Sequence, residues 1–193
     1  MRYPTIKLLF IALVLILTSM GRSKGQSVSL EMATSPNIDF DFNTINKYIT
    51  GIIFMNACEL DITVQGVQWD LYVGATTSNT GYWDVSTQYS SYGEDPPIDI
   101  LELRFRNSAN TSLVPGFFPI RDIGSPVYII GTNSAPDIAV NCPNQGTNQP
   151  GDFHTSPSCY KFNVDMKITP GLNPVYKAGL YTMRIDYVLV EDL

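Results

Sequence analysis

The chain has very few of the residues from which enzyme and metal sites are built. Among its 193 residues there is one histidine, His154, and three cysteines, none of which form a Cys-x-x-Cys pair. After residue 25 the sequence contains no Gly-x-Ser-x-Gly nucleophile motif, and the Asp-x-Asp-x-Asp-Gly pattern of a calcium loop is absent. We therefore predict a protein that is not an enzyme, with no catalytic residues, no metal and no cofactor.

Basic residues are also scarce. The sequence has 12 Lys and Arg against 18 Asp and Glu, and four of the bases (Arg2, Lys7, Arg22 and Lys24) fall within the first 25 residues. The remainder of the chain thus has eight bases against all 18 acids. Binding to nucleic acid or to an anionic membrane surface requires clustered Lys and Arg, so neither is expected as a partner.

The start of the chain has the pattern of a secretory signal peptide. Arg2 and Lys7 precede an apolar run over residues 8–17, and the small residues Ser23 and Gly25 follow. A membrane anchor needs about 20 apolar residues, which this run does not reach. We expect a signal peptide over residues 1–25 and a single domain over 26–193. The protein should be exported to the periplasm, the cell surface or the extracellular space, with no membrane span after cleavage.

No apolar pattern of 3.6-residue period and helical length follows Gln26. Eleven Tyr, nine Phe, 14 Gly and 13 Pro favour strands and turns. Alternating or continuous apolar segments lie at 28–32, 38–42, 48–55, 60–64, 68–75, 83–88, 100–107, 115–120, 127–130 and 162–168. This spacing predicts an all-β, immunoglobulin-like sandwich of two antiparallel sheets. Residues 131–158 form the longest irregular region, which is either functional or merely irregular.

The last segment has the strongest alternation. Its apolar row consists of Tyr181, Met183, Ile185, Tyr187 and Leu189, with a mixed row between them. Because chain ends fray unless a sheet holds them, we predict that this segment is a central strand. Tyr181 is either the tyrosine of a tyrosine corner or an ordinary core residue.

Candidate binding residues are limited to aromatic side chains. Tyr82, Trp83 and Tyr92 lie in a polar, aromatic stretch, and flat rings on loops can stack on sugars. Glycan contact is one interpretation of this stretch, and a core position for Trp83 is the other. His154 is interpreted as a solvated loop residue.

Three short stretches together resemble secreted pilin-like domains. Ala178-Gly179-Leu180-Tyr181-Thr182 is similar to their closing strand, 37–42 to a strand near their start, and 69–73 to their central strand. The family includes the spore coat protein U-like domains and related uncharacterised secreted bacterial proteins. The resemblance implies an immunoglobulin-like sandwich, export, and assembly into surface fibres by strand exchange.

We therefore expect a secreted, non-enzymatic structural or adhesin-type subunit of the cell surface or extracellular space. Its partners would be surface proteins, copies of itself included. The alternative is a carbohydrate-binding module that uses the aromatic residues around Trp83. Burial of Val28, Leu30 and Met32 is worth roughly 5 to 8 kcal/mol before ordering costs, which is thin support for a polymer joint. We accordingly expect residues 27–33 to pair within their own sandwich.

The cysteines lead to a testable prediction. Cys142 and Cys159 bracket the long irregular region, and in an oxidising compartment a bridge between them would contribute about 3 kcal/mol. Cys58 lies beside a strand and is interpreted as a small buried hydrophobe. Peptide mapping without reduction should therefore find a Cys142–Cys159 link and a Cys58 thiol. A link from Cys58 to either of the others would contradict this assignment.

Overall fold

The computed structural model describes residues 27–33, 37–107, 116–130, 154, 157–171 and 175–192. The expected signal peptide and most of the expected irregular region lie outside these residues. Cys142 lies outside them too, so the Cys142–Cys159 bridge stays a prediction. Cys159 is buried, and Cys58 is buried as a free thiol, as predicted.

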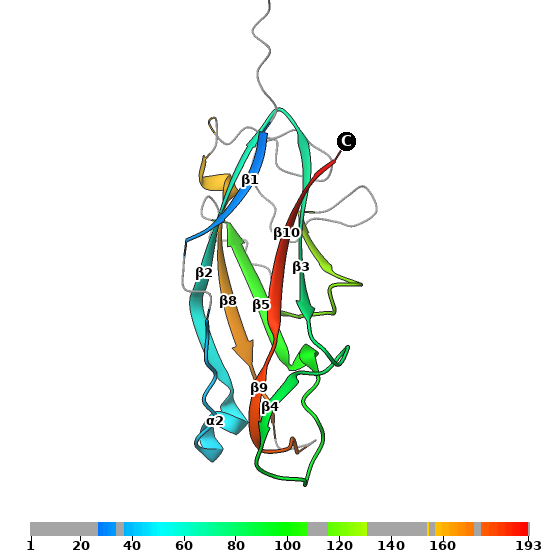
Figure 1. The fold of residues 1–193 in the computed structure, drawn as a ribbon. Helices are drawn as coiled ribbons and strands as arrows, with labels where there is room; N and C mark the ends of the chain where they lie inside the picture. The colour runs from blue at the N-terminus through cyan, green and yellow to red at the C-terminus, as the bar shows by residue number, and fades with distance from the viewer. Residues whose placement is uncertain are drawn as a thin grey trace, which may run out of the picture.

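Two antiparallel sheets make up most of the described chain (Figure 1). The larger sheet has the order β1 (Ser27–Met32), β2 (Ile52–Gln65), β8 (Lys161–Ile168), β5 (Leu101–Asn107) and β6 (Phe118–Pro119). The smaller one has the order β10 (Arg184–Asp192), β3 (Gln68–Thr76) and β7 (Val127–Ile130). A two-stranded ribbon joins β4 (Asp84–Gln88) to β9 (Gly179–Thr182). The predicted antiparallel, mostly β architecture is confirmed.

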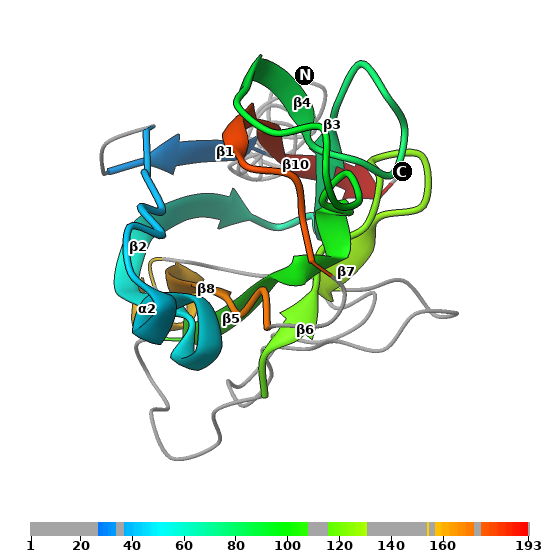
Figure 2. The ribbon, with the colours of Figure 1, turned by 90° about the horizontal axis from the view of Figure 1, so that it is seen from below.

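The two sheets share one apolar core, and Figure 2 shows them along the strands. The inward row of β3, which is Trp69, Leu71, Val73 and Ala75, is at most 2 % exposed. The predicted inward rows of the larger sheet are also buried: Leu101, Leu103, Phe105, Phe162, Val164, Met166 and Ile168. Residues that alternate in sequence therefore face a common interior, as a period of two requires.

The prediction that residues 48–55 form a strand is wrong in its first half. Residues Ile45–Thr50 form the helix α2, and two 3₁₀ turns lie at Ile98–Ile100 and Pro157–Tyr160. The Thr44 hydroxyl accepts a hydrogen bond from the Lys47 N–H at 3.3 Å, and Gly51, with φ of 78°, ends the helix. A helix of six residues is too short for apolar periodicity to reveal it; only its caps could have done so.

The prediction of a central last strand is also wrong. β10 is paired with β3 on one side and, among the described residues, is the edge strand of its sheet. Its inward residues Met183, Ile185, Tyr187 and Leu189 pack against the core but are only partly buried. Alternation shows that one face of a strand meets a core, but it carries no information on how many neighbours the strand has.

Residues 38–42, predicted to be a strand, have the expected burial without the strand. Ile38, Phe40 and Phe42 are half-buried and Asp39 and Asp41 are exposed, yet this segment belongs to no sheet. Ring contacts hold it in place: Phe40 lies 5.0 Å from Phe54, and Phe42 lies 5.8 Å from Tyr48, both edge to face. By contrast, β1 pairs with β2 over its whole length, which confirms that the first segment belongs to its own sheet.

A buried carboxylate organises the outer face of the larger sheet. Asp165 of β8 is fully buried and is bound by Arg104 at 2.7 Å and by Arg106 at 2.8 Å. It also accepts the backbone N–H of Asn56, a residue with φ of 53° at the bulge of β2. Burial alone would raise the pKa of Asp165, but the hydrogen bonds from Arg106, Asn56 and Arg104 outweigh it and lower the pKa below 3.8.

Replacing Asp165 by Asn should reduce the free energy of unfolding by roughly 3 kcal/mol at pH 7, because both guanidinium groups lose their counter-charge. Since the folded pKa of Asp165 is lowered, its contribution is fully present above pH 3.8 and is lost as the pH falls towards the folded value. Urea unfolding at several pH values measures this. The difference between Asp165→Asn and the wild type should therefore shrink in acid.

Glu102→Gln provides the control, because Glu102 pairs with Lys167 at the partly exposed surface of the same sheet. Its effect should stay within about 1 kcal/mol. Equal effects of Glu102→Gln and Asp165→Asn would contradict the role given to Asp165.

Candidate functional site

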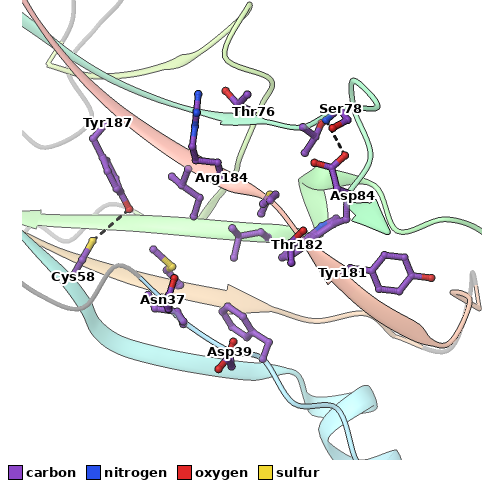
Figure 3. A pocket seen from close by; sticks show the side chains of 18 of the residues that line it. Asn37, Asp39, Cys58, Thr76, Ser78, Asp84, Tyr181, Thr182, Arg184 and Tyr187 are labelled. Atoms are coloured by element: carbon purple, nitrogen blue, oxygen red, sulfur yellow. Dashed lines mark hydrogen bonds between the residues drawn. The ribbon is translucent and has the colours of Figure 1, made fainter. Parts of the chain in front are cut away.

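A groove runs between the segment 37–43 and the continuous stretch of β9 and β10 (Figure 3). Its main hollow has a volume of about 910 Å³. Cys58, Leu101 and Met166, all residues of the core, form its floor. On this side of the molecule the groove therefore reaches between the two sheets as far as buried core residues.

A second hollow of about 850 Å³ continues the groove towards α2. It shares Ile38, Asp39, Phe40, Trp83 and Tyr181 with the first hollow. The aromatic residues that line it are Phe40, Phe42, Tyr48, Trp83, Tyr89, Tyr176 and Tyr181. The groove is thus more apolar and more aromatic towards α2.

One wall of the groove carries backbone groups that point into it. The Ala75 N–H donates to the Arg121 carbonyl at 2.7 Å, and the Ala75 carbonyl accepts from the Ile123 N–H at 2.8 Å, so both groups point away from β10. Ala75 is opposite Ile185 in the β3–β10 ladder. In an antiparallel pair of this kind, the backbone groups of the opposite residue also point outward.

The alternation of the ladder extends this result along β10. Ile185 and Tyr187 direct their N–H and C=O groups towards the groove, while Asp186 and Val188 direct theirs towards β3. Within the described ranges, no backbone hydrogen bond joins Ile185 or Tyr187 to another segment. The same two residues point their side chains at the core, so the edge combines a hydrogen-bonding rim with an apolar floor.

The opposite wall has a similar character. Of its backbone groups, only the Asp41 carbonyl has a partner among the described residues, the Lys47 ammonium at 3.0 Å. The alternating burial of Ile38, Phe40 and Phe42 gives this wall an apolar side as well. Two backbone edges thus face one apolar groove.

A polar pair interrupts the floor. The Cys58 Sγ and the Tyr187 hydroxyl lie 3.4 Å apart, as Figure 3 shows. Burial raises the pKa of the Cys58 thiol, and burial together with the neighbouring thiol raises the pKa of Tyr187. A thiol with a raised pKa is a poor nucleophile near neutral pH.

The structure separates the aromatic residues singled out in the sequence. Trp83 lines both hollows, and its indole N–H donates to the Pro97 carbonyl at 3.1 Å. Tyr82 and Tyr92 are 44 % and 78 % exposed and are not among the residues that line either hollow. His154 is exposed and does not line them either.

Sequence reasoning missed the main elements of the groove. The last strand was expected to have neighbours on both sides, so Ile185 and Tyr187 were assigned to the core alone. In the alternating segment 38–42, Asp39 falls in the polar row, which by itself indicates only a solvated residue. Asp84 stands in no recognisable motif, although its carboxylate accepts the Ser78 N–H at 2.8 Å beside the groove. No local pattern reveals which strand ends at a sheet edge.

Tyr181 fixes the turn that leads into the groove wall. Its hydroxyl donates to the Lys177 carbonyl, four residues upstream, at 2.8 Å. This is the hydrogen bond of a tyrosine corner. The structure therefore supports the corner rather than an ordinary core position for Tyr181. The bond holds β9 where it begins, next to both hollows.

Neither a metal centre nor a membrane helix is evident in the described part of the chain. No group of three or more His, Cys, Asp or Glu side chains there could hold a metal ion. None of the helices described is long and apolar enough to span a bilayer.

No protein-family model matches the chain, and neither does any curated protein.

Replacing Tyr181 by Phe should lower the free energy of unfolding by about 1 kcal/mol, because the Lys177 carbonyl loses its hydrogen bond while the ring stays in place. Thermal unfolding measures this. Tyr92→Phe is the matched control, since Tyr92 is exposed and should leave the melting temperature unchanged. Equal melting temperatures for all three proteins would show that the corner adds no stability.

Proposed function

We propose that this protein is an exported, non-enzymatic subunit of a surface or extracellular structure. In this proposal it has an immunoglobulin-like sandwich and binds an extended segment of another polypeptide in the groove beside β10. The segment would add as a strand to the open edge of the smaller sheet. Such β-strand addition derives affinity from main-chain hydrogen bonds and specificity from alternate side chains.

The strand order supports the immunoglobulin-like part of the proposal. In the seven-stranded arrangement, strands A, B, E and D form one sheet and C, F and G the other. Here β1-β2-β8-β5 matches the order A-B-E-D, and β3-β10 matches C-F. No described strand takes the place of G, which would lie beside β10. The Tyr181–Lys177 hydrogen bond at the start of the F-like strand agrees with this assignment.

The observation that carries the proposal is the open backbone edge at Ile185 and Tyr187. Proteins usually protect edge strands with proline, bulges or a covering segment, because an exposed edge pairs with other chains. Residues 184–192 contain no proline, and β10 pairs with β3 in an unbroken register. The half-buried side chains of Ile185 and Tyr187 would become covered when a strand adds there.

The two walls limit how a segment can bind. β10 runs away from the end of the molecule where α2 lies, whereas the segment 37–43 runs towards it (Figure 1). A bound strand would therefore be parallel to one wall and antiparallel to the other. It would have about seven residues in contact if it matched the length of the 37–43 wall at about 3.3 Å per residue.

The chemistry of the groove favours binding over catalysis. No histidine is among the described residues that line it, and the one thiol there has a raised pKa. Nucleophilic chemistry at a thiol is therefore not well supported.

Glycan binding is the second candidate function. Trp83 and Tyr89 line the second hollow together with Asp39 and Asp41, and aromatic rings beside carboxylates are suited to sugars. Two facts weaken this candidate. The Trp83 N–H is already used by Pro97, and Tyr82 and Tyr92 stand apart from the groove.

Hydrogen exchange at single residues tests strand addition. In the purified chain, the amides of Ile185 and Tyr187 should exchange quickly, because they face the groove, while those of Asp186 and Val188 should exchange slowly. In the protein recovered within its native extracellular material, the first pair should become protected. Mass spectrometry with residue-level fragmentation measures both states.

The alternating direction of the β10 amides provides an internal control, since those of Asp186 and Val188 face β3 and should be protected in both states. Fast exchange of Ile185 and Tyr187 in the native material would contradict strand addition. Slow exchange of the same two amides in the purified chain would show that the edge is already occupied.

A further inference from the structure

The charges around the groove identify the kind of segment that fits it. The carboxylates that line it are Asp39 and Asp41 on one wall and Asp84 on β4 beside the other. Arg184 and Lys177 also line it, but each is already paired with a carboxylate.

These pairs leave the groove with excess negative charge. Arg184 lies 2.9 Å from Asp186, and Lys177 lies 2.9 Å from Asp95. Asp39 has no ion-pair partner among the described residues. The Lys47 ammonium lies 3.0 Å from the Asp41 carbonyl oxygen, so a segment that enters the groove meets the uncompensated negative charge at Asp39 and Asp84.

Among the chain's own alternating segments, β5 carries Arg104 and Arg106 but is paired on both sides, with β8 and β6. The two segments nearest the N-terminus do not suit these surroundings. β1 carries Glu31, and the segment 37–43 carries Asp39 and Asp41, so either one from a second copy would bring acid to acid. Moreover, β1 is already paired with β2 over its whole length. With a net charge of −6 for the whole sequence, two copies also repel each other as they approach.

We infer that the groove binds a cationic segment of a different polypeptide, with apolar residues at alternate positions and Lys or Arg at the positions between them. The inference rests on the proposed strand addition and specifies its partner. The apolar residues would lie over Ile185, Tyr187 and the core floor. The basic residues would lie at the rim, near Asp39 and Asp84. Charges at a rim act mainly on association rate and partner choice.

Three synthetic heptapeptides test this inference. All have valine at alternate positions, and the positions between carry Lys, Gln or Glu. Binding to the full mature chain is measured by fluorescence anisotropy at low and at physiological salt. The Lys peptide should bind about tenfold more tightly than the Glu peptide, with the Gln peptide between them. Added salt should reduce this ratio.

Two double variants that remove the same charge test whether the preference for the Lys peptide arises in the groove. Asp39→Asn with Asp84→Asn should bring the three affinities close together. The Asp84→Asn change keeps a side-chain oxygen that can still accept the Ser78 N–H. Glu59→Gln with Asp61→Asn is the control. It removes the same charge from residues that pair with Lys161 outside the groove, and it should keep the Lys preference.

The possible outcomes distinguish the charge preference from strand addition itself. Equal binding of all three peptides, with protection of the Ile185 and Tyr187 amides, would overturn the charge preference and leave strand addition intact. Loss of the Lys preference in the Glu59→Gln and Asp61→Asn variant would overturn the assignment to the groove. Absence of binding by any peptide would count against strand addition itself. Tighter binding of the Glu peptide would overturn the inference outright.

Discussion

The β3–β10 ladder is the interaction on which the proposed binding groove depends. Ala75 uses both of its backbone groups on the β7 side of β3, and this decides which residues of β10 face outward. Ile185 and Tyr187 consequently present N–H and C=O groups to the groove and side chains to the core. If the register were shifted by one residue, Asp186 and Val188 would take these positions, and an acidic side chain would face the apolar floor.

The two sheets contribute differently to stability and to binding. In the larger sheet, β2, β8 and β5 have neighbours on both sides, and Asp165 ties Arg104, Arg106 and the bulge at Asn56 together on its outer face. In the smaller sheet the inward row of β3 is fully buried, but the inward row of the edge strand β10 is only partly covered. A fully paired layer thus packs against one whose edge strand is partly covered, which is the arrangement that the proposed strand addition requires.

The two walls of the groove are held differently: sheet pairing with β3 holds β10, whereas side-chain contacts hold the segment 37–43 and help to fix the start of β9. Ring contacts of Phe40 and Phe42 keep the segment 37–43 against the domain, and the Tyr181 hydroxyl holds the start of β9. This leaves the backbone groups of 185 and 187 and most of those of 37–43 available to a bound segment. In the proposed strand addition, the acidic side chains at the rim would discriminate among segments of similar apolar pattern.

Much of the fold is predictable from local pattern. Alternation located the inward rows of β3, β5 and β8, but for Tyr181 the sequence left a tyrosine corner and an ordinary core position both open. The class, mostly β with antiparallel sheets, follows from the same period of two and from the abundance of turn residues. The helix α2 escaped prediction because its six residues give no periodic signal.

The candidate site was decided by tertiary structure alone. The same alternation describes a strand at the centre of a sheet and a strand at its edge, because side-chain period reports on faces and not on neighbours. Residues 38–42 have the alternation of a strand but no partner, since pairing depends on what lies beside them in space. The sequence by itself therefore determined which side chains turn inward. Only the folded arrangement decided that β10 has an open edge, that the segment 37–43 lies across from it, and that Asp39 and Asp84 border the same groove.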